Sequence, residues 1–509
     1  VNVDGGSTTV NPALTMGTQS GGGSSSASIK VTNGTFTTNA NVTRGAGATT
    51  ASIEISGGTF NATNKTIGSA AAPIDLTFTG GTLQTLNQLN SGSTPLTKTG
   101  AGTATLTGAN AYTGGTNVNE GTLLVNGSTS ATGVVQVAAS ATLGGTGTVG
   151  GAVTVAAGGT VAPGLSPGLL AAQSVTFSAG SFFSAEIDGT TAGTGYDQLS
   201  TTGAVDLGGA TLQLSGAYLP TVGDSFTLIS ASGGVTGTFA GLAGGDLLFV
   251  NGRPVTIEYN STSVVLSFTQ TPVFTGTAGN DQYRVYLSGS NVVVELGGSP
   301  LMTTPLSSLT SLTINGGDGD DTLTVDYSAG GFFNLPINFH GQGNNSTNPG
   351  DRIIVSGGTF GTVTKTHTGL DSGTINFDGT LIAYTGLEPV DVAGSTITNL
   401  VINLPSSNDI TTFSLSGSNL IVTNTNATHE SDVISLAGVT SIVVNGGDGN
   451  DVLTFDSSLS TYTGTLVVNG QGGASDLIVI QSGVKLTANA DHGADLALLG
   501  GQLLVTTAS

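Results

Sequence analysis

The chain contains no cysteine and no tryptophan, and it is poor in proline and in positive charge. Without cysteine it can form neither a disulfide framework nor a thiolate metal site. Only 9 of its 509 residues are lysine or arginine, which excludes the clustered cations that hold nucleic acid or an anionic membrane. The 82 glycines follow no three-residue period and only 14 prolines accompany them, so a collagen-like chain is excluded too.

Long apolar runs are also missing. No stretch approaches the about 18 residues of a membrane-spanning helix, and no signal peptide is recognisable. The chain begins at Val1 without a methionine and within a strand-like pattern, which indicates a processed or excised piece of a longer polypeptide.

What the chain does contain is apolar residues in a polar but weakly charged background. Hydrophobic residues make up 37% of it and charged residues 8%, so a core is available and the surface must consist mainly of Thr, Ser, Asn and Gly. The net charge is −22, and the acidic residues concentrate after residue 270. This balance suits solvated cations as partners.

A short phrase recurs through the first third of the chain: an alternating strand, a glycine turn, a threonine and an apolar residue. Its copies end at Phe36, Phe60, Leu83, Leu106, Leu123, Leu143 and Val161. Two-residue alternation predicts strands, and no segment shows the period of a helix. A repeat of about 20 residues with several strands each is typical of a β-solenoid.

The acidic half repeats at a longer interval. "NDQYRVYLSGSN" from Asn280 returns as "NDITTFSLSGSN" from Asn408, 128 residues further on. We therefore predict an all-β, elongated, right-handed parallel β-helix or β-solenoid with a less regular β region in the middle. The expected parts are solenoid, irregular or capping β region, and two acidic repeat units, over residues 1–174, 175–270, 271–390 and 391–509.

From Leu96 the chain reads "LTKTGAGTATLTGANAYTGGTNVNEGTLLVNG". This closely resembles the autotransporter-associated β-strand repeat of bacterial secreted passenger proteins, and similar phrasing continues over 96–268. The resemblance implies a right-handed β-helix that is exported to the cell surface.

Two acidic turns resemble the RTX (haemolysin-type) calcium nonapeptide, Gly-Gly-x-Gly-x-Asp-x-apolar. "GGDGDDTL" runs from Gly316 to Leu323 and "GGDGNDVL" from Gly446 to Leu453, and a partial copy begins at Gly276. In that family the motifs follow one another in tandem, so that stacked turns share an ion, whereas here each stands alone.

Calcium needs six to eight oxygen ligands, more than one turn supplies. An acidic residue stands about one coil later in each repeat, so we expect two paired structural Ca²⁺ sites. The first would use Asp318, Asp320 and Asp321 with Asp351; the second would use Asp448, Asn450 and Asp451 with Asp476; Asp281 marks the partial copy. The alternative is that Asp, Asn and Gly here only form turns, without any metal.

No catalytic constellation emerges from the sequence. "GTGTVG" at Gly145 lacks the following helix of a dinucleotide site, and "GLSPG" around Ser166 lacks the helix of a nucleophile elbow. The four histidines, His340, His367, His429 and His492, show no ligand spacing. We therefore predict no enzyme and no cofactor other than Ca²⁺.

The expected function is that of a non-enzymatic, secreted or cell-surface bacterial structural protein: a fibre, spacer or surface-layer subunit that self-associates, with adhesion or contact with surface polysaccharide as open additions. The alternative is a carbohydrate-binding or polysaccharide-degrading β-helix protein. Ice or mineral binding by threonine rows is a third reading.

Overall fold

The computed structural model describes residues 1–18, 24–46, 49–92, 94–164, 166–343, 350–387, 390–472, 476–489, 495–499 and 502–505. Within these ranges the regular elements are strands and three short 3₁₀ turns, and most strand pairs are parallel, so the predicted all-β solenoid is confirmed. The chain forms two compact units: Val1–Asn251 with Val255–Phe268, and Gly252–Pro254 with Thr269–Ser509. The finer division into four parts stays a prediction.

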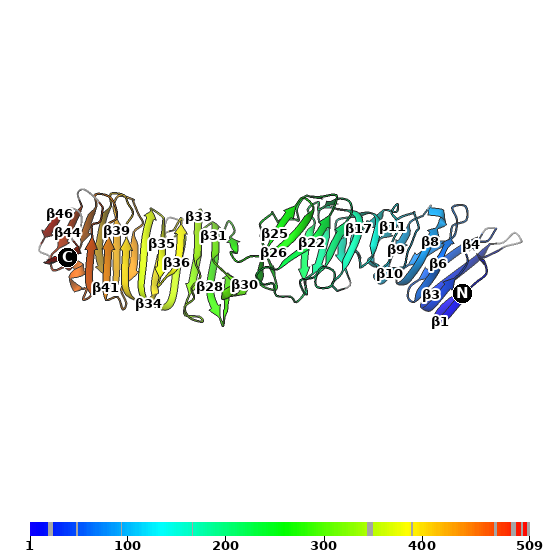
Figure 1. Ribbon diagram of the computed structural model, residues 1–509, viewed down its shortest axis with the longest axis horizontal. Coiled ribbons are helices and arrows are strands. Elements are labelled where there is room, and N and C mark those ends of the chain that lie inside the picture. The colour runs from blue at the N-terminus through cyan, green and yellow to red at the C-terminus, as the bar shows by residue number, and fades with distance from the viewer. Residues whose placement is uncertain are drawn as a thin grey trace. The chain divides into compact units, whose positions relative to one another are not determined.

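In the first unit, parallel strands stack in three sets, and the blue to green strands of Figure 1 follow this order. The first set contains β3 (Ser25–Thr38), β5 (Thr49–Ile55), β7 (Asp75–Phe78), β9 (Leu96–Lys98), β11 (Thr116–Val118), β13 (Val135–Val137), β15 (Thr148–Val155), β17 (Leu169–Phe177), β20 (Val205–Asp206) and β23 (Val235–Thr236). The second contains β1 (Asn2–Val10), β3, β6 (Thr59–Ile67), β8 (Gly81–Leu89), β10 (Thr103–Thr107), β12 (Gly121–Val125), β14 (Ala141–Gly145), β16 (Thr160–Pro163), β18 (Phe182–Glu186) and β21 (Thr211–Ser215). The third contains β2 (Leu14–Met16) and β4 (Val42–Arg44) and later β15, β17, β19 (Gln198–Thr201) and β22 (Ser225–Ala231), with η1 (Asn90–Gly92) between.

The recurring apolar residues of the sequence pair row upon row in the second set. Phe36 pairs with Phe60, Phe60 with Leu83 and Leu83 with Leu106, and all four are fully buried. The rings of Phe36 and Phe60 stack with centroids 5.1 Å apart. Each coil therefore covers the apolar row of its neighbour, which is why the phrase repeats.

The pairing register of this row shifts between Leu106 and the next copy of the repeated sequence. Leu106 pairs with Val125, whereas Leu123 lies two residues earlier and continues the row with Leu143 and Val161. Side chains alternate between the two faces of a strand, so a slip of two residues keeps the apolar residues on the inner face. The core stays continuous through the change of register.

The first unit ends in antiparallel strands. β22 pairs with β26 (Ser263–Phe268), which pairs with β25 (Arg253–Asn260), and β24 (Leu247–Val250) precedes them. This antiparallel pairing occupies the edge of β22 that a further parallel coil would otherwise take.

Each of the two repeats of the second unit contributes parallel strands to two stacks (Figure 1). One stack contains β27 (Val273–Thr275), β31 (Leu312–Asp318), β33 (Ile337–Gly343) and β36 (Thr380–Thr385), then β37 (Val390–Asn403), β41 (Ser441–Asn445), β43 (Thr465–Asn469), β45 (Lys485–Asn489) and β47 (Gln502–Val505). The other contains β28 (Gln282–Ser288), β32 (Thr322–Asp326) and β34 (Arg352–Gly369), then β38 (Ile410–Ser416), β42 (Val452–Phe455), β44 (Leu477–Gln481) and β46 (Asp495–Leu499).

Antiparallel hairpins interrupt these stacks, although we expected coils alone. They are formed by β28 with β29 (Asn291–Leu296) and β30 (Ser299–Pro305), by β34 with β35 (Ser372–Phe377) and β36, and by β38 with β39 (Asn419–Asn424) and β40 (Asp432–Ser435); η2 (Leu306–Ser308) and η3 (Ser457–Thr461) are short turns. The turns after β28 and β38 begin with Gly289 and Gly417, whose φ angles are 62° and 64°. A two-residue loop with positive φ is the favoured hairpin connection, so the repeated "SGSN" carried this signal.

Candidate functional site

The residues predicted to bind calcium fall into a buried set and a solvent-facing set. The buried ones are Asp281, Asp321, Asp351, Asp451 and Asp476. Asp318, Asp448 and Asn450 are exposed, and Asp320 is half-buried. Each buried aspartate directly precedes a strand of the second unit, whereas the others lie in or beside the turn before it.

The buried aspartates of the first repeat stack on one another. The backbone N–H of Asp281 donates to Oδ1 of Asp321, 2.7 Å away, and the N–H of Asp321 donates to Oδ1 of Asp351, also 2.7 Å away. We call these three residues the first aspartate column. The carboxyl groups of Asp321 and Asp351 each satisfy a backbone donor of the preceding coil, which holds adjacent corners in register, whereas that of Asp281 accepts from the N–H of Thr277 in its own turn.

The second repeat contains an equivalent second aspartate column. The N–H of Asp409 donates to Oδ1 of Asp451 at 2.8 Å, and the N–H of Asp451 donates to Oδ1 of Asp476 at 3.0 Å. Asp409 was not among the predicted site residues. Its place 128 residues after Asp281, in the same repeated phrase, is the signal that identifies it.

The glycines of the acidic turns make room for these carboxyl groups. A Cβ atom at Gly316 would clash with Oδ2 of Asp321, and one at Gly446 would lie 2.9 Å from Oδ2 of Asp451. Gly319 has a φ angle of 135°, which a side chain would strain. The motif is therefore accounted for by a buried aspartate packed against a glycine backbone.

Burial makes the carboxyl groups of Asp321, Asp409 and Asp451 hard to ionise. It raises the pKa of Asp451 to about 7, against the opposing hydrogen bond from Asp409. Burial also raises the pKa of Asp321 and of Asp409. Oδ2 of each of these three side chains has no hydrogen-bond partner. The columns consequently call for a proton or a cation near neutral pH.

The solvent-facing acids extend over the next coil. A Cβ atom at Gly343 would clash with Oδ1 of Asp318, and one at Gly472 would clash with Oδ1 of Asp448. Within the described residues, one group of three His, Asp or Glu side chains has ligand atoms close enough together to hold a metal ion. That group does not lie at these turns. Calcium at these turns stays a prediction.

A buried lysine holds two coils together in the first unit. Lys98 is fully buried, and its ammonium group donates to the carbonyl oxygens of Thr99, Gly100 and Glu120 at 3.0, 2.6 and 2.9 Å. Burial lowers the pKa of Lys98, and the charge of Glu120 counteracts this. The side chain thus ties the end of β9 to the corner that precedes β12.

Replacing Lys98 with methionine is expected to destabilise the first unit by about 1–3 kcal/mol, because three carbonyl oxygens lose their donor. Lys30→Met is the matched control: Lys30 forms an exposed pair with Glu54 at 3.0 Å and should matter little. Denaturant unfolding and hydrogen exchange of β9–β12 measure the difference. Equal stability of the two variants would contradict a structural role for Lys98.

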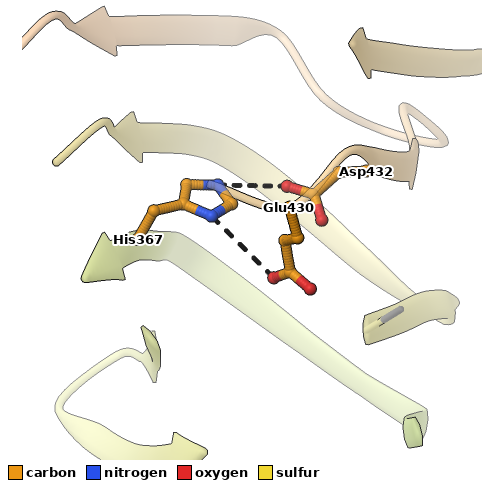
Figure 2. A group of neighbouring side chains, drawn as sticks. All are labelled: His367, Glu430 and Asp432. Atoms are coloured by element: carbon orange, nitrogen blue, oxygen red, sulfur yellow. Dashed lines mark ion pairs between the residues drawn. The ribbon is translucent and has the colours of Figure 1, made fainter. Parts of the chain in front are cut away.

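The second unit also encloses a buried charged cluster, which we define as Lys365, His367, Glu430 and Asp432. Lys365 and His367 lie on β34, Asp432 is the first residue of β40, and Glu430 lies two residues before it. Figure 2 shows how His367, Glu430 and Asp432 face one another. Lys365 Nζ lies 2.8 Å from Glu430 Oε1 and contacts Asp432 Oδ1. His367 Nε2 lies 3.1 Å from Asp432 Oδ2, and its Nδ1 lies 3.8 Å from Glu430 Oε1.

Further buried polar groups surround the cluster. The Tyr384 hydroxyl donates to Glu430 Oε1 at 2.7 Å. His429 lies 4.7 Å from His367 between ring centroids, with its nitrogens near the Thr411 hydroxyl and the Glu430 carbonyl. Burial lowers the pKa of His429 to about 4, so this imidazole is neutral at physiological pH.

The sequence analysis did not identify this cluster. His367 and Asp432 are 65 residues apart, and "KTH" and "HESD" match no ligand spacing. Strand alternation was an available signal, since Val363, Lys365 and His367 share one face of β34 and all three are buried. Of the other histidines, His340 lies beside Thr385, and His492 lies outside the described residues.

Comparison with known proteins gives one family match. Residues 96–125 match the model of the passenger-associated transport repeat, a segment that comprises β9, β10, β11 and β12. Among curated protein sequences, none matches the chain significantly. The described residues include no helix with the length and apolarity to cross a membrane. The wider resemblance over 126–268 and the RTX-like turns stay predictions.

The strands of the matched segment are arranged like those of the neighbouring coils of the first unit. Two of its strands belong to the first set and two to the second. β9 and β10 pair in parallel with β7 and β8 before the segment, and β11 and β12 pair in parallel with β13 and β14 after it. A repeat of this family implies an extracellular or cell-surface protein. The chain thus carries an autotransporter-type passenger repeat, built into a continuous β-solenoid.

Proposed function

We propose that this chain is a non-enzymatic structural segment of a secreted or cell-surface bacterial protein, serving as a fibre, spacer or surface-layer subunit. The passenger repeat at 96–125 is the observation that carries the proposal. The architecture supports it, because stacked parallel coils bury a continuous apolar core along the first unit.

Surface location is testable on intact cells of the source organism. Antibodies raised against the chain should label unpermeabilised cells or the culture medium, and added protease should remove the label. A cytoplasmic protein of the same cells serves as the control that stays protected. Labelling that requires permeabilised cells would contradict the proposal.

Self-association is the second part of the proposal. The low charge content of 8% leaves long faces of Thr, Ser, Asn and Gly that can pack against copies of themselves. Negative-stain microscopy and sedimentation over a range of protein concentrations should show fibres, layers or concentration-dependent oligomers. A monomer at every concentration would limit the function to that of a spacer.

Structural calcium at the acidic turns is the third part, and it rests on the paired position of acids in adjacent coils. Calorimetric titration of the chelator-treated chain should show binding in the millimolar range or tighter, weakened by Asp448→Asn. The polysaccharide alternative gains no support from the surface: of the described large apolar side chains that are exposed, Phe332 is the aromatic one.

A further inference from the structure

The buried charged cluster contains nitrogen and oxygen atoms that have no hydrogen-bond partner in the protein. Both ring nitrogens of His367, Oε2 of Glu430 and Oδ2 of Asp432 have no hydrogen-bond partner, although these side chains are at most 7% exposed. One ligand atom from each lies within 4.8 Å of the others. Buried polar atoms without partners are costly, so such a group calls for an ion, a proton or a water molecule.

The charges around the cluster do not balance. When ionised, Glu430 and Asp432 carry two negative charges against the single ammonium group of Lys365. A bound cation would neutralise the negative charge that remains.

The contact between His367 and Asp432 has the geometry of two ligands of one ion. Nε2 and Oδ2 are 3.1 Å apart, and the contact lacks the alignment of a full N–H···O hydrogen bond. Two atoms that each bind one ion at about 2.1 Å are about 3.0 Å apart at the right angles of octahedral coordination and about 3.4 Å apart at tetrahedral angles. A protonated imidazole would instead direct its N–H at the carboxylate.

The neighbouring groups are placed to support such an ion. Lys365 contacts Oε1 of Glu430 and Oδ1 of Asp432, so it orients both carboxylates and leaves the second oxygen of each unengaged. Glu430 Oε1 also lies 3.8 Å from Nδ1 of His367, and its Oε2 has no hydrogen-bond partner, so Glu430 can supply the third ligand atom.

We propose that His367, Glu430 and Asp432 bind a divalent transition-metal ion of the Zn²⁺ class inside the second unit. A nitrogen ligand with carboxylate oxygens suits Zn²⁺, Mn²⁺ or Ni²⁺, whereas Ca²⁺ takes oxygen ligands. The ion would connect β34 to β40, which are far apart in sequence. Because the site is buried, the ion would enter while the chain folds.

The full chain is to be unfolded in chelator, refolded with Zn²⁺, desalted and analysed for metal by mass spectrometry. We expect one Zn²⁺ per chain in the wild type, and a loss of about tenfold or more in His367→Gln and Asp432→Asn. His340→Gln and Asp448→Asn are the matched controls, because they change a histidine outside the cluster and an acidic turn. Both should keep the metal, and excess Ca²⁺ should not displace it.

Two results would overturn the proposal: a wild-type chain that refolds with Zn²⁺ present but retains none, or a His367→Gln variant that retains as much as the wild type. The first result is also the one expected if a proton on His367 balances the cluster instead. If the variants fail to fold, visible absorption of the Co²⁺-refolded wild type still decides the matter. Bands of nitrogen-ligated Co²⁺ support the site, and the spectrum of hydrated Co²⁺ contradicts it.

Discussion

Replacing Lys365 with methionine is expected to lower the unfolding free energy of the second unit by about 3–5 kcal/mol. Lys365 is 4% exposed and pairs with both Glu430 and Asp432. Burial lowers its pKa, but the charges of those two acids outweigh burial and raise it, so the ammonium group stays charged. Methionine fills a similar volume while leaving two buried carboxylates without their cation.

The effect is to be measured by thermal and denaturant unfolding in chelator, with hydrogen exchange to locate it in β34, β36 and β40. Lys485→Met, at an exposed position on β45, is the matched control and should change stability by less than about 0.5 kcal/mol. A Lys365→Met variant as stable as this control would show that the carboxylates become protonated at little cost. In that event the cluster contributes little to the fold.

The second large effect expected is a loss of stability of the second unit as pH rises. Burial raises the pKa of Asp451 to about 7, so the folded state holds this proton more tightly than the unfolded chain does. Stability from such a group is fully present below the unfolded pKa of about 4 and is lost as pH rises through the folded value. The window for Asp451 therefore runs from about pH 4 to pH 7, and Asp321 and Asp409 act in the same direction.

His429 acts in the opposite direction, because its folded pKa of about 4 lies below the unfolded one. His429 is present in both wild type and Asp451→Asn, so its contribution cancels when the stabilities of the two chains are compared. Asparagine keeps an oxygen for the N–H of Asp409 but cannot ionise. We expect the variant to gain stability relative to the wild type between pH 5 and pH 8, by on the order of 1–2 kcal/mol in chelator.

Asp448→Asn, at the exposed position of the same turn, should leave the pH dependence unchanged. Identical slopes for Asp451→Asn and the wild type would refute proton storage in the second aspartate column. Repeating the series with Ca²⁺ tests the proposed calcium independently. Bound calcium should stabilise the wild type at pH 8 through the ionised carboxylates. If Ca²⁺ leaves the stability unchanged, the column binds protons but no calcium.

Several features of the fold were predictable from local pattern. Two-residue alternation, glycine corners and a phrase ending at Phe36, Phe60, Leu83 and Leu106 predicted stacked parallel strands, and these residues do pair in one row. The reason is that a side chain's face is set by the strand's own period. The slip before Leu123 was not predictable, since a shift of two residues leaves the same pattern in the sequence.

The aspartate columns were predictable in part. A repeated turn placed Asp321 ahead of Asp351 and Asp451 ahead of Asp476 at about one coil's distance, and the structure stacks each pair. Their bonding was not predictable, because a carboxyl group that caps a neighbouring backbone N–H and one that faces an ion leave the same residue in the same turn.

The sequence by itself determined the strand character of the chain, its winding into coils and the residues that form its apolar rows, because these depend on neighbours within a few positions. Only the tertiary structure decided what surrounds the buried charges. Lys365 and His367 meet Glu430 and Asp432 because β40, from the hairpin of the second repeat, lies against β37, and β37 pairs with β34 of the first repeat. No local pattern encodes such a contact, since its energy appears only when both elements are already folded and water has been excluded from between them.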